Sequence, residues 1–395
     1  MNSVNLLSWL NFFIADVRDG LGPFLGIFLK NHGFLEGQIG LINSLASFSA
    51  LVFGLPFGIL IDKTLKKRFI VGFCIFLIII AVSLNYFFAN FTFTLLAQIG
   101  IALSGAFLGP AFCAITLGVV GLNHYAKQTA KNEIYKHFGT LFGAILSFFC
   151  AYFYGIASIF MITALMGIIS LFLLSLLKEK SINHKIARGE LKHIKKESLL
   201  KSLMDKRVLL LSFVMFCFHL SNAYMLPLLS QRAHSMGVDS SGAYAALTIM
   251  IAQGTMIIVV FMCSKFILKK HDFKIYFYLI FISLLELIIR GFVAANFTHI
   301  VAMVFVQILD GIGAGITGVI LPIMVAKILL GSGHVNAGFS LVLISGGVGG
   351  ALSAMIAGFI AQNYSFFYAY VFLAFIAFIG LLFWTLSFRW FYLGK

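Results

Sequence analysis

Long apolar runs alternate with short polar connections along the whole chain. A run of about 20 apolar residues is long enough to cross the hydrocarbon core of a bilayer as a helix. The pattern predicts about twelve such helices, over residues 6–29, 36–60, 69–89, 93–119, 133–153, 156–177, 208–230, 240–263, 273–292, 297–326, 335–361 and 364–388. The sequence therefore predicts an all-α polytopic membrane protein.

The composition agrees with a membrane protein. Of the 395 residues, 61% are hydrophobic and 10% are charged, whereas globular chains are about a quarter charged. The apolar runs do not alternate in polarity as the strands of a membrane β-barrel do. No signal peptide is expected, because the first ten residues contain no Lys or Arg. The five cysteines lie in apolar runs without CxxC spacing, so neither a metal site nor a disulfide is expected.

The basic residues are distributed unevenly between the connections. With the N-terminus inside, the even-numbered connections and the C-terminus hold 24 of the 28 Lys and Arg, and the odd connections hold only Lys30 and Arg232. This asymmetry predicts that both termini are cytoplasmic. The net charge of +15 therefore reflects topology, and a nucleic-acid partner is not expected.

The chain is predicted to consist of two related halves. A basic linker at 178–207 separates a six-helix bundle at 1–177 from a second at 208–395. The halves match at a nearly constant offset, in which Asn90-Phe91-Thr92 corresponds to Asn296-Phe297-Thr298 and Pro23 to Pro227. Gly139 and Gly143 similarly correspond to Gly346 and Gly350. The pattern indicates a parallel six-helix duplication.

The connection "GILIDKTLKKR" (58–68) resembles the cytoplasmic signature of the major facilitator superfamily. Gly58, Asp62, Lys63, Lys66 and Lys67 match its pattern, and Leu65 replaces a usual glycine. In that family the aspartate locks the outward-facing state by pairing with a helix end and a cation, and the resemblance implies this role for Asp62. The alternative is an ordinary positive-inside loop. The second half has Ser264 at the corresponding place, so any such latch is one-sided.

Three further segments, "ADVRDGLGPFL", "FHLSNAYMLPL" and "LDGIGAGITGVILP", resemble a bacterial subgroup of this superfamily with mostly unassigned substrates and some siderophore exporters. The resemblance covers the whole chain and implies a twelve-helix transporter of a bacterial inner membrane. Two markers of drug/proton antiporters are missing. The fourth predicted helix has Gln98 and Ile101 where those proteins carry an arginine, and Gly143 is followed by alanine rather than proline.

Several polar residues lie inside apolar runs, where a lipid-exposed charge costs about 2.5–3.5 kcal/mol. The resemblance implies that helices one, four, seven and ten line a central cavity. The polar residues of these helices are the candidates for proton coupling or substrate binding: Asp16, Arg18, Asp19, Gln98, Ser104, His219, Asn222, Tyr224, Gln307 and Asp310. His219 is expected to face Asp16. The structural alternative pairs Asp19 with Arg18, or Asp310 with Arg290.

Other polar and glycine positions have more ordinary interpretations. Glu286 and Arg290 are spaced i,i+4 on the ninth predicted helix, which favours a buried intrahelical ion pair. His137 lies near the cytoplasmic end of the fifth predicted helix, where it is either a gate or proton relay or an interfacial histidine. The glycines at 311–315 and 346–350 are expected to permit close helix packing.

The favoured function is therefore secondary active transport of a small polar or zwitterionic organic solute, with a lean to export and a siderophore-like metabolite as one candidate. The chain has no ATP-binding motif, so a proton gradient is expected to drive transport without a cofactor. The alternatives are proton-coupled uptake, drug/proton antiport and a transporter-like sensor. A membrane enzyme is disfavoured because the polar groups do not cluster at one membrane face. The expected partners are the substrate and the bilayer, and the expected state is a monomer.

Overall fold

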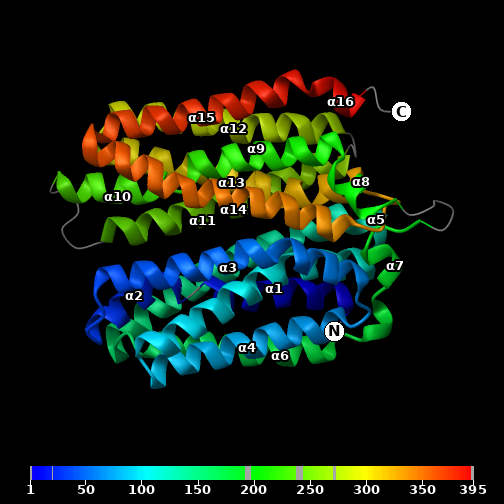
Figure 1. Cartoon of the computed structure of the whole chain (residues 1–395), viewed down its shortest axis with the longest axis horizontal. Helices are drawn as coiled ribbons and strands as arrows, with labels where there is room; N and C mark the ends of the chain where they lie inside the picture. Colours follow the sequence, from blue (N-terminus) through cyan, green and yellow to red (C-terminus); the bar gives the residue numbers. More distant parts are fainter. Residues whose placement is uncertain (1, 20, 192–196, 237–242, 270–272, 393–395) are drawn as a thin grey trace. The chain divides into compact units, whose positions relative to one another are not determined.

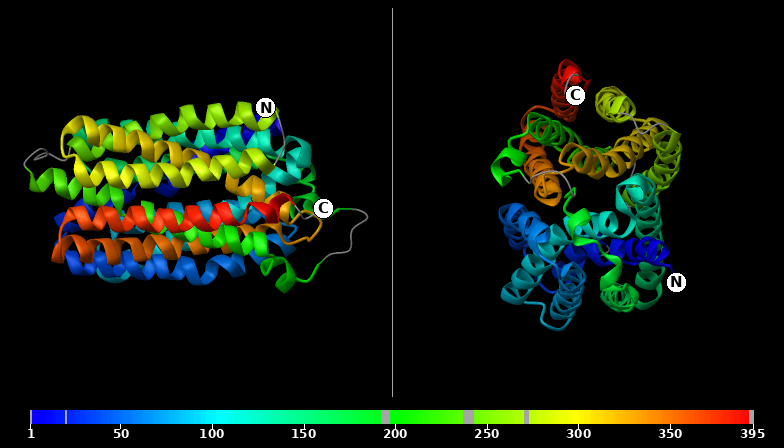
Figure 2. Two further views of the ribbon diagram at one scale, coloured as in Figure 1. Left: turned by 90° about the horizontal axis from the view of Figure 1, so that it is seen from above. Right: turned by 90° about the vertical axis from the view of Figure 1, so that its right-hand side faces the viewer.

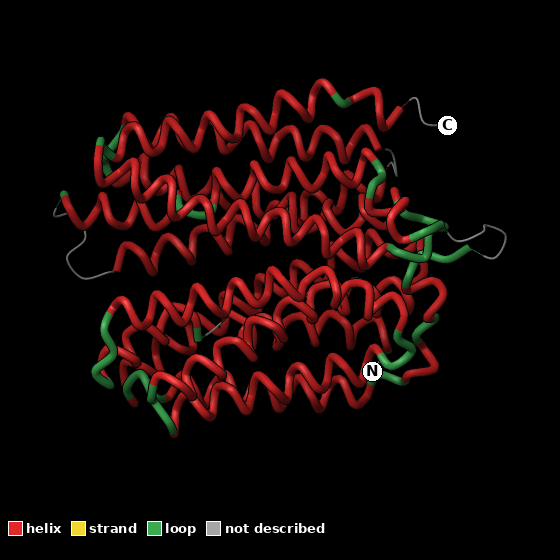
Figure 3. The backbone as a smooth tube through the Cα atoms, in the orientation of Figure 1, coloured by secondary structure: helices red, strands yellow, loops and turns green. Residues whose placement is uncertain are grey.

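The computed structural model describes residues 2–19, 21–191, 197–236, 243–269 and 273–392. Within these ranges the chain forms helices joined by turns and loops, and no strand is present (Figure 3). Helices are the natural outcome for apolar segments of this length, because each helix satisfies its backbone hydrogen bonds internally where lipid offers no partner. The predicted all-α class is thus confirmed.

The chain divides into two compact units. Unit 1 comprises Met1–Glu197 with Leu329–Ser340, and unit 2 comprises Ser198–Ile328 with Leu341–Lys395. The helices assigned wholly to unit 1 (Figure 1) are α1 (Ser3–Asp19), α2 (Gly22–Asn31), α3 (Glu36–Lys63), α4 (Lys67–Phe87), α5 (Phe91–Tyr154), α6 (Ser158–Leu176), the 3₁₀ turn η1 (Glu179–Ser181) and α7 (His184–Ala187).

Unit 2 contains most of the remaining elements. They are α8 (Leu199–Leu203), α9 (Lys206–Asn222), α10 (Met225–Ser235), α11 (Ala243–Lys269), α12 (Phe273–Asn296), α13 (Ile300–Ile328), α15 (Phe366–Leu386) and α16 (Phe388–Tyr392). Helix α14 (Val335–Asn363) starts in unit 1 and continues in unit 2. Because unit 1 extends to Glu197, the described part of the linker up to that residue packs with the N-terminal helices.

Each unit repeats the same pattern of helix packing. In unit 1, α1 packs on α6, α4 on α5 and α6, and α3 on α5. In unit 2, α9 packs on α15, α12 on α13 and α15, and α11 on α13. Under the predicted correspondence of the halves these are equivalent pairs, and the end-on view of Figure 2 shows the helices of each unit standing side by side. The duplication itself stays a prediction.

The first long apolar segment of each unit is interrupted just before a proline. Helix α1 ends at Asp19 and α2 begins at Gly22, next to Pro23. Helix α9 ends at Asn222 and α10 begins at Met225, two residues before Pro227. A proline has no N–H to donate to the carbonyl four residues earlier, so it is tolerated in the first turn of a helix but not in the interior. Each break places polar residues at the end of a half-helix inside the predicted span.

Among the described residues, ten helices are long and apolar enough to cross a membrane. This count differs from the predicted twelve for local reasons. Element α5 covers two predicted spans, and its 64 residues form two helices that meet at a kink at Gly121. Gly121 has φ 70° and ψ 172°, a conformation that only glycine adopts readily. The predicted first span is divided between α1 and α2, each shorter than a bilayer requires.

Many large apolar side chains lie on the outside of the helices. Phe48, Phe172 and Phe359 are 65%, 63% and 62% exposed. A water-soluble monomer rarely exposes so many contiguous apolar groups, whereas lipid solvates them well. The chain is therefore a membrane protein, and the burial of charged side chains within its helices needs a separate explanation.

Candidate functional site

A buried ion pair joins two helices of unit 2. Arg290 of α12 places Nη1 2.8 Å from Oδ1 of Asp310 on α13, and the two side chains are 0% and 13% exposed. The same Nη1 donates a hydrogen bond to Oδ1 of Asn222, the last residue of α9. Three helices thus contribute to one charge network. Of the two predicted interpretations of Asp310, its pairing with Arg290 is realised in the structure.

Glu286 does not form the predicted ion pair with Arg290. Glu286 lies one turn earlier on α12 and is 4% exposed, and among the described residues neither of its carboxyl oxygens has a hydrogen-bond partner. Arg290 turns across to α13 because packing brings Asp310 within 2.8 Å of it. The expectation of an intrahelical pair was wrong, since the i,i+4 rule takes no account of partners on neighbouring helices.

The charged cluster, defined as Asn222, Glu286, Arg290 and Asp310, is enclosed by close helix packing. A side chain added at Gly313 of α13 would collide with Oε1 of Glu286, so this glycine provides the space for the carboxyl group.

Gln307 lies one turn before Asp310 and is 0% exposed, and among the described residues both polar atoms of its amide lack hydrogen-bond partners. Unpartnered buried polar groups are uncommon in folded proteins and point to a role beyond stability.

Close packing also surrounds other predicted polar residues of unit 2. A Cβ at Gly346 would lie 2.5 Å from the His219 ring, so the ring of His219 on α9 packs directly on α14. Ser353 Oγ lies 3.2 Å from the backbone N–H of Tyr224, which donates to it, and the Tyr224 hydroxyl accepts from Gln231 at 3.1 Å. The predicted role of the 346–350 glycines in close packing agrees with these contacts.

Unit 1 also buries an acidic side chain on its first helix. Asp16 of α1 is 3% exposed, and a side chain at Gly143 of α5 would collide with its carboxyl oxygen. The side chains of Arg18 and Asp19 lie outside the described residues. The structure therefore places Asp16 against α5, as glycine packing places Glu286 against α13.

Two predicted residues of the fourth span lie in the first part of α5. Ser104 is buried at 4% exposure. Gln98 is half-buried, and its amide nitrogen has no hydrogen-bond partner. These two positions are polar, but the structure adds no ligand geometry to them.

A polar network between α1 and α5 escaped the sequence analysis. Gln128 donates to Ser8 Oγ at 3.1 Å and to Asn132 Oδ1 at 2.7 Å, and Asn132 donates to Thr116 at 3.1 Å. These residues are 0–6% exposed. Because Gln128 falls in a predicted polar connection, nothing in the sequence distinguished it from a solvated residue.

His137 belongs to a small acid–base group on α5. Its Nε2 lies 3.7 Å from Oε2 of Glu133, one turn earlier, and Glu133 also pairs with Lys136. His137 is 6% exposed, so it is more enclosed than an interfacial histidine. Its predicted gating role stays a prediction.

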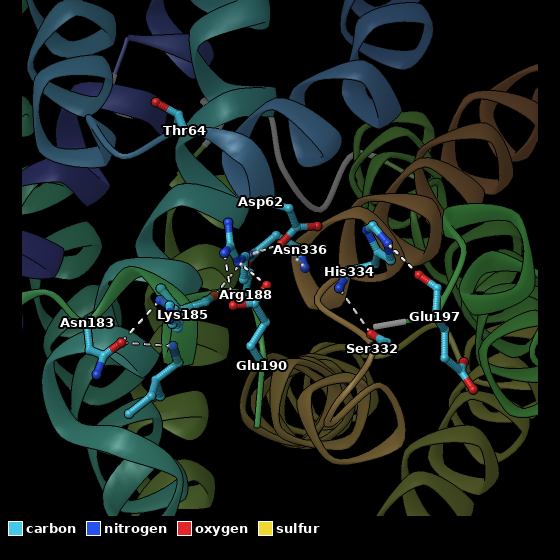
Figure 4. A network of polar contacts seen from close by, with 12 residues as sticks. Asp62, Thr64, Asn183, Lys185, Arg188, Glu190, Glu197, Ser332, His334 and Asn336 are labelled. Atoms are coloured by element: carbon cyan, nitrogen blue, oxygen red, sulfur yellow. Dashed lines mark hydrogen bonds and ion pairs between the residues drawn. The ribbon is translucent and has the colours of Figure 1, made fainter. Parts of the chain in front are cut away.

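Asp62 caps the start of α14 (Figure 4). Its carboxylate accepts hydrogen bonds from the backbone N–H of Asn336 at 3.2 Å and of Ala337 at 2.9 Å, and from the Asn336 side chain at 2.8 Å. A helix N-terminus carries unpaired N–H groups and a partial positive charge, and it therefore attracts a carboxylate. The predicted pairing of Asp62 with a helix end is present.

The neighbours of Asp62 in the signature have unequal roles. Gly58 allows α14 to approach, because a Cβ there would lie 2.7 Å from the Asn336 carbonyl oxygen. Lys63 is exposed. Lys67, one of the lysines that match the signature, is 0% exposed and donates to the Thr64 carbonyl at 2.6 Å.

The linker strengthens the start of α14. Asn336 Nδ2 also donates to the Ala187 carbonyl at 2.9 Å, and the N–H of Gly331 donates to the Gly189 carbonyl at 2.6 Å. Arg188 pairs with Glu190 at 2.8 Å beside Asp62 (Figure 4). This part of the linker is packed structure rather than a solvated tether.

The buried charges inside two units of long apolar helices are features of a polytopic membrane protein of the transporter class. Residues 4–289 match the family model described as Major Facilitator Superfamily. Two relatives in Mycobacterium tuberculosis, the uncharacterized MFS-type transporters MT2531 of strain CDC 1551 and Rv2456c of strain H37Rv, are each 32% identical over 362 residues, covering 90% of this chain and 85% of theirs. The chain belongs to the major facilitator superfamily, as its signature segment predicted.

Solved structures of this superfamily share the fold. The Escherichia coli fucose:proton symporter FucP in the outward conformation has a TM-score of 0.77 at 16% identity, covering 98% of both chains. A FucP variant has a TM-score of 0.74 at 17% identity, covering 97% of this chain and 98% of that one. The human organic anion transporter MFSD10 has a TM-score of 0.74 at 14% identity, covering 96% of this chain and 98% of that one. The chain is a transporter-family protein and not an enzyme.

Proposed function

We propose that the protein is a secondary active transporter that moves a small polar or zwitterionic organic solute by alternating access, driven by protons and directed outward. Its membership of the superfamily supports transport. The mixture of acidic, basic and amide side chains in its apolar helices favours a polar solute over a greasy one, and a siderophore-like metabolite is one candidate. Proton-coupled uptake is the principal alternative, since the fold neighbour FucP is a fucose:proton symporter.

The membrane arrangement follows from the same proposal. If α5 crosses twice with its turn near Gly121, and if α1 with α2 forms one crossing, the ten candidate helices become twelve spans. The uneven distribution of Lys and Arg then supports cytoplasmic termini and insertion in a bacterial inner membrane. A cysteine-accessibility assay on Lys30→Cys and Lys180→Cys tests this arrangement, because the two labels are expected on opposite sides of the membrane.

The Arg290–Asp310 pair is the observation on which proton coupling rests. A buried ion pair seldom increases stability over an apolar pair of the same volume, so charges retained at 0% and 13% exposure need a functional reason. A carboxyl group that gains and loses a proton as the protein changes state supplies that reason. We assign coupling to Asp310 and Asp16, each on a helix that the resemblance places beside the transport path.

The Asp62 cap is proposed to act as the cytoplasmic latch. It holds the first turn of α14 through three hydrogen bonds, and it must open if α14 moves during the transport cycle. Because such bonds to a charged group are worth about 1.5–3 kcal/mol each, the cap is strong enough to bias one state and weak enough to release.

Transport into proteoliposomes with an imposed pH gradient tests the proposal. Wild type is compared with Asp16→Asn and Asp310→Asn, with Glu197→Gln as a control at an exposed carboxylate. The candidate solutes are first screened by thermal shift. We expect proton-driven flux in wild type and in the control, and loss of proton dependence in one or both aspartate variants. Unchanged proton dependence in both variants would remove the coupling assignment.

A further inference from the structure

The charged cluster of unit 2 contains two carboxyl groups but only one cation. Arg290 engages Asp310 at 2.8 Å and leaves Glu286 with no hydrogen-bond partner among the described residues. The charged groups that act on Glu286 are Arg290 on its own helix and Asp310 of α13. Within the described residues, the other helices packed against α12, which are α9, α11, α15 and α16, bring no further charge to it.

The geometry excludes an organic ligand or a metal ion as the missing partner of Glu286. Arg290 and Gln307 are 0% exposed and Glu286 is 4% exposed, and the backbone of α13 at Gly313 lies directly against the carboxyl group. The described residues contain no group of three His, Cys, Asp or Glu side chains that would hold a metal. A proton is the one ligand that needs no vacant volume, and it removes the charge that an apolar interior disfavours.

Arg290 has enough donors to pair with either carboxyl group. Among the described residues its Nε and Nη2 have no hydrogen-bond partners, so donors remain for Glu286. Glu286 is one helical turn away, a spacing at which side chains meet on a helix surface. Asp310 is the more exposed of the two acids, at 13%, and is therefore the one that solvent protons reach first.

We propose that Glu286 is the inner proton carrier of the transporter and that Arg290 pairs with whichever carboxyl group is ionised. This inference rests on the proposed proton coupling and adds a second carboxyl group to it. In the structure the proton is on Glu286 and Arg290 is on Asp310. In the alternate state the O–H bond of Glu286 breaks, the proton passes to a carboxyl oxygen of Asp310, and the guanidinium turns to the Glu286 carboxylate. The proton count and the net charge of the cluster are the same before and after.

Infrared spectroscopy of the purified full-length protein tests the inference without a substrate. Protonated carboxyl groups have a C=O stretch that shifts on transfer to D₂O, and its area counts them. Wild type is compared at neutral pH with Glu286→Gln, Asp310→Asn, Arg290→Gln and the exposed control Glu197→Gln. We expect one carboxyl equivalent to disappear in Glu286→Gln and no change in the control.

The other two variants distinguish a shared cation from an isolated buried acid. In Asp310→Asn the freed arginine is expected to ionise Glu286, so the same equivalent disappears, whereas Arg290→Gln is expected to add one. A band that survives in Glu286→Gln overturns the proton assignment, and a band that survives in Asp310→Asn overturns the sharing. If Arg290→Gln does not fold, the two isosteric acid variants decide the question. If the variants give the expected band pattern but leave proton-driven flux unchanged, the proposed coupling is rejected. The assignment of a proton to Glu286 is then kept.

Discussion

Two buried carboxyl groups, Asp62 and Glu286, have opposite surroundings. Both are 3–4% exposed, but Asp62 accepts three hydrogen bonds from the start of α14 whereas Glu286 accepts none. Donors at a helix N-terminus offset part of the cost of burying the Asp62 carboxylate. A carboxyl group without donors is tolerated in an apolar interior only when its charge is removed. Burial alone therefore does not define a role, and the surrounding donors distinguish a carboxyl group that caps a helix from one that lies in an apolar interior without donors.

Neutralising each acid with its isosteric amide gives the largest expected contrast. Asp62→Asn replaces the charged acceptor and turns an amide N–H₂ toward backbone donors, so we expect a loss of about 3 kcal/mol in unfolding free energy. Glu286→Gln replaces a group that already lacks bonds, so we expect a change below about 0.5 kcal/mol. Denaturation of the two variants in detergent, with exposed Lys63→Ala as control, measures both. Equal destabilisation of the two variants would contradict the comparison.

Filling the space that Gly313 leaves for the Glu286 side chain is expected to have an intermediate effect on stability. In Gly313→Ala the new methyl group collides with the Glu286 carboxyl group, and overpacking a core typically costs about 1–3 kcal/mol. Gly254→Ala on α11 is the matched control, because a Cβ there meets no atom within 4 Å. The control is expected to be stabilised by about 0.5–1 kcal/mol through helix propensity. Thermal unfolding of both variants checks the difference, and a destabilised control would show that the space around Gly313 is not the cause.

The smallest expected effect is a pH dependence near the Asp62 cap. Burial, with the nearby charge of Lys67 as a second cause, lowers the pKa of His184 in the linker below its usual 6.5. Below pH 6.5 the unfolded chain therefore binds a proton that the folded chain does not, and stability falls as the pH falls through this range. We expect His184→Gln to lose part of this dependence. The measurement is the midpoint of unfolding on either side of pH 6.5 for both proteins, and identical pH profiles would reject the assignment.

Much of the candidate site was visible in the sequence as residue types. Asp16, Asp310 and Arg290 stand out because charges inside apolar runs are rare, and Asp62 stands out through the "GILIDKTLKKR" segment. Gln128 and Asn132 did not, because polar residues near the ends of spans are common and only packing reveals that they are enclosed.

The sequence by itself determined which segments are helices and which ends carry the basic residues. These properties depend on hydropathy and charge, which act over a few residues of local chain. The tertiary structure alone decided that Arg290 pairs with Asp310 and not Glu286, and that Asp62 binds the start of α14. Partner choice depends on distances between helices far apart in the chain, because an electrostatic contact in an apolar interior is decided within a few ångströms.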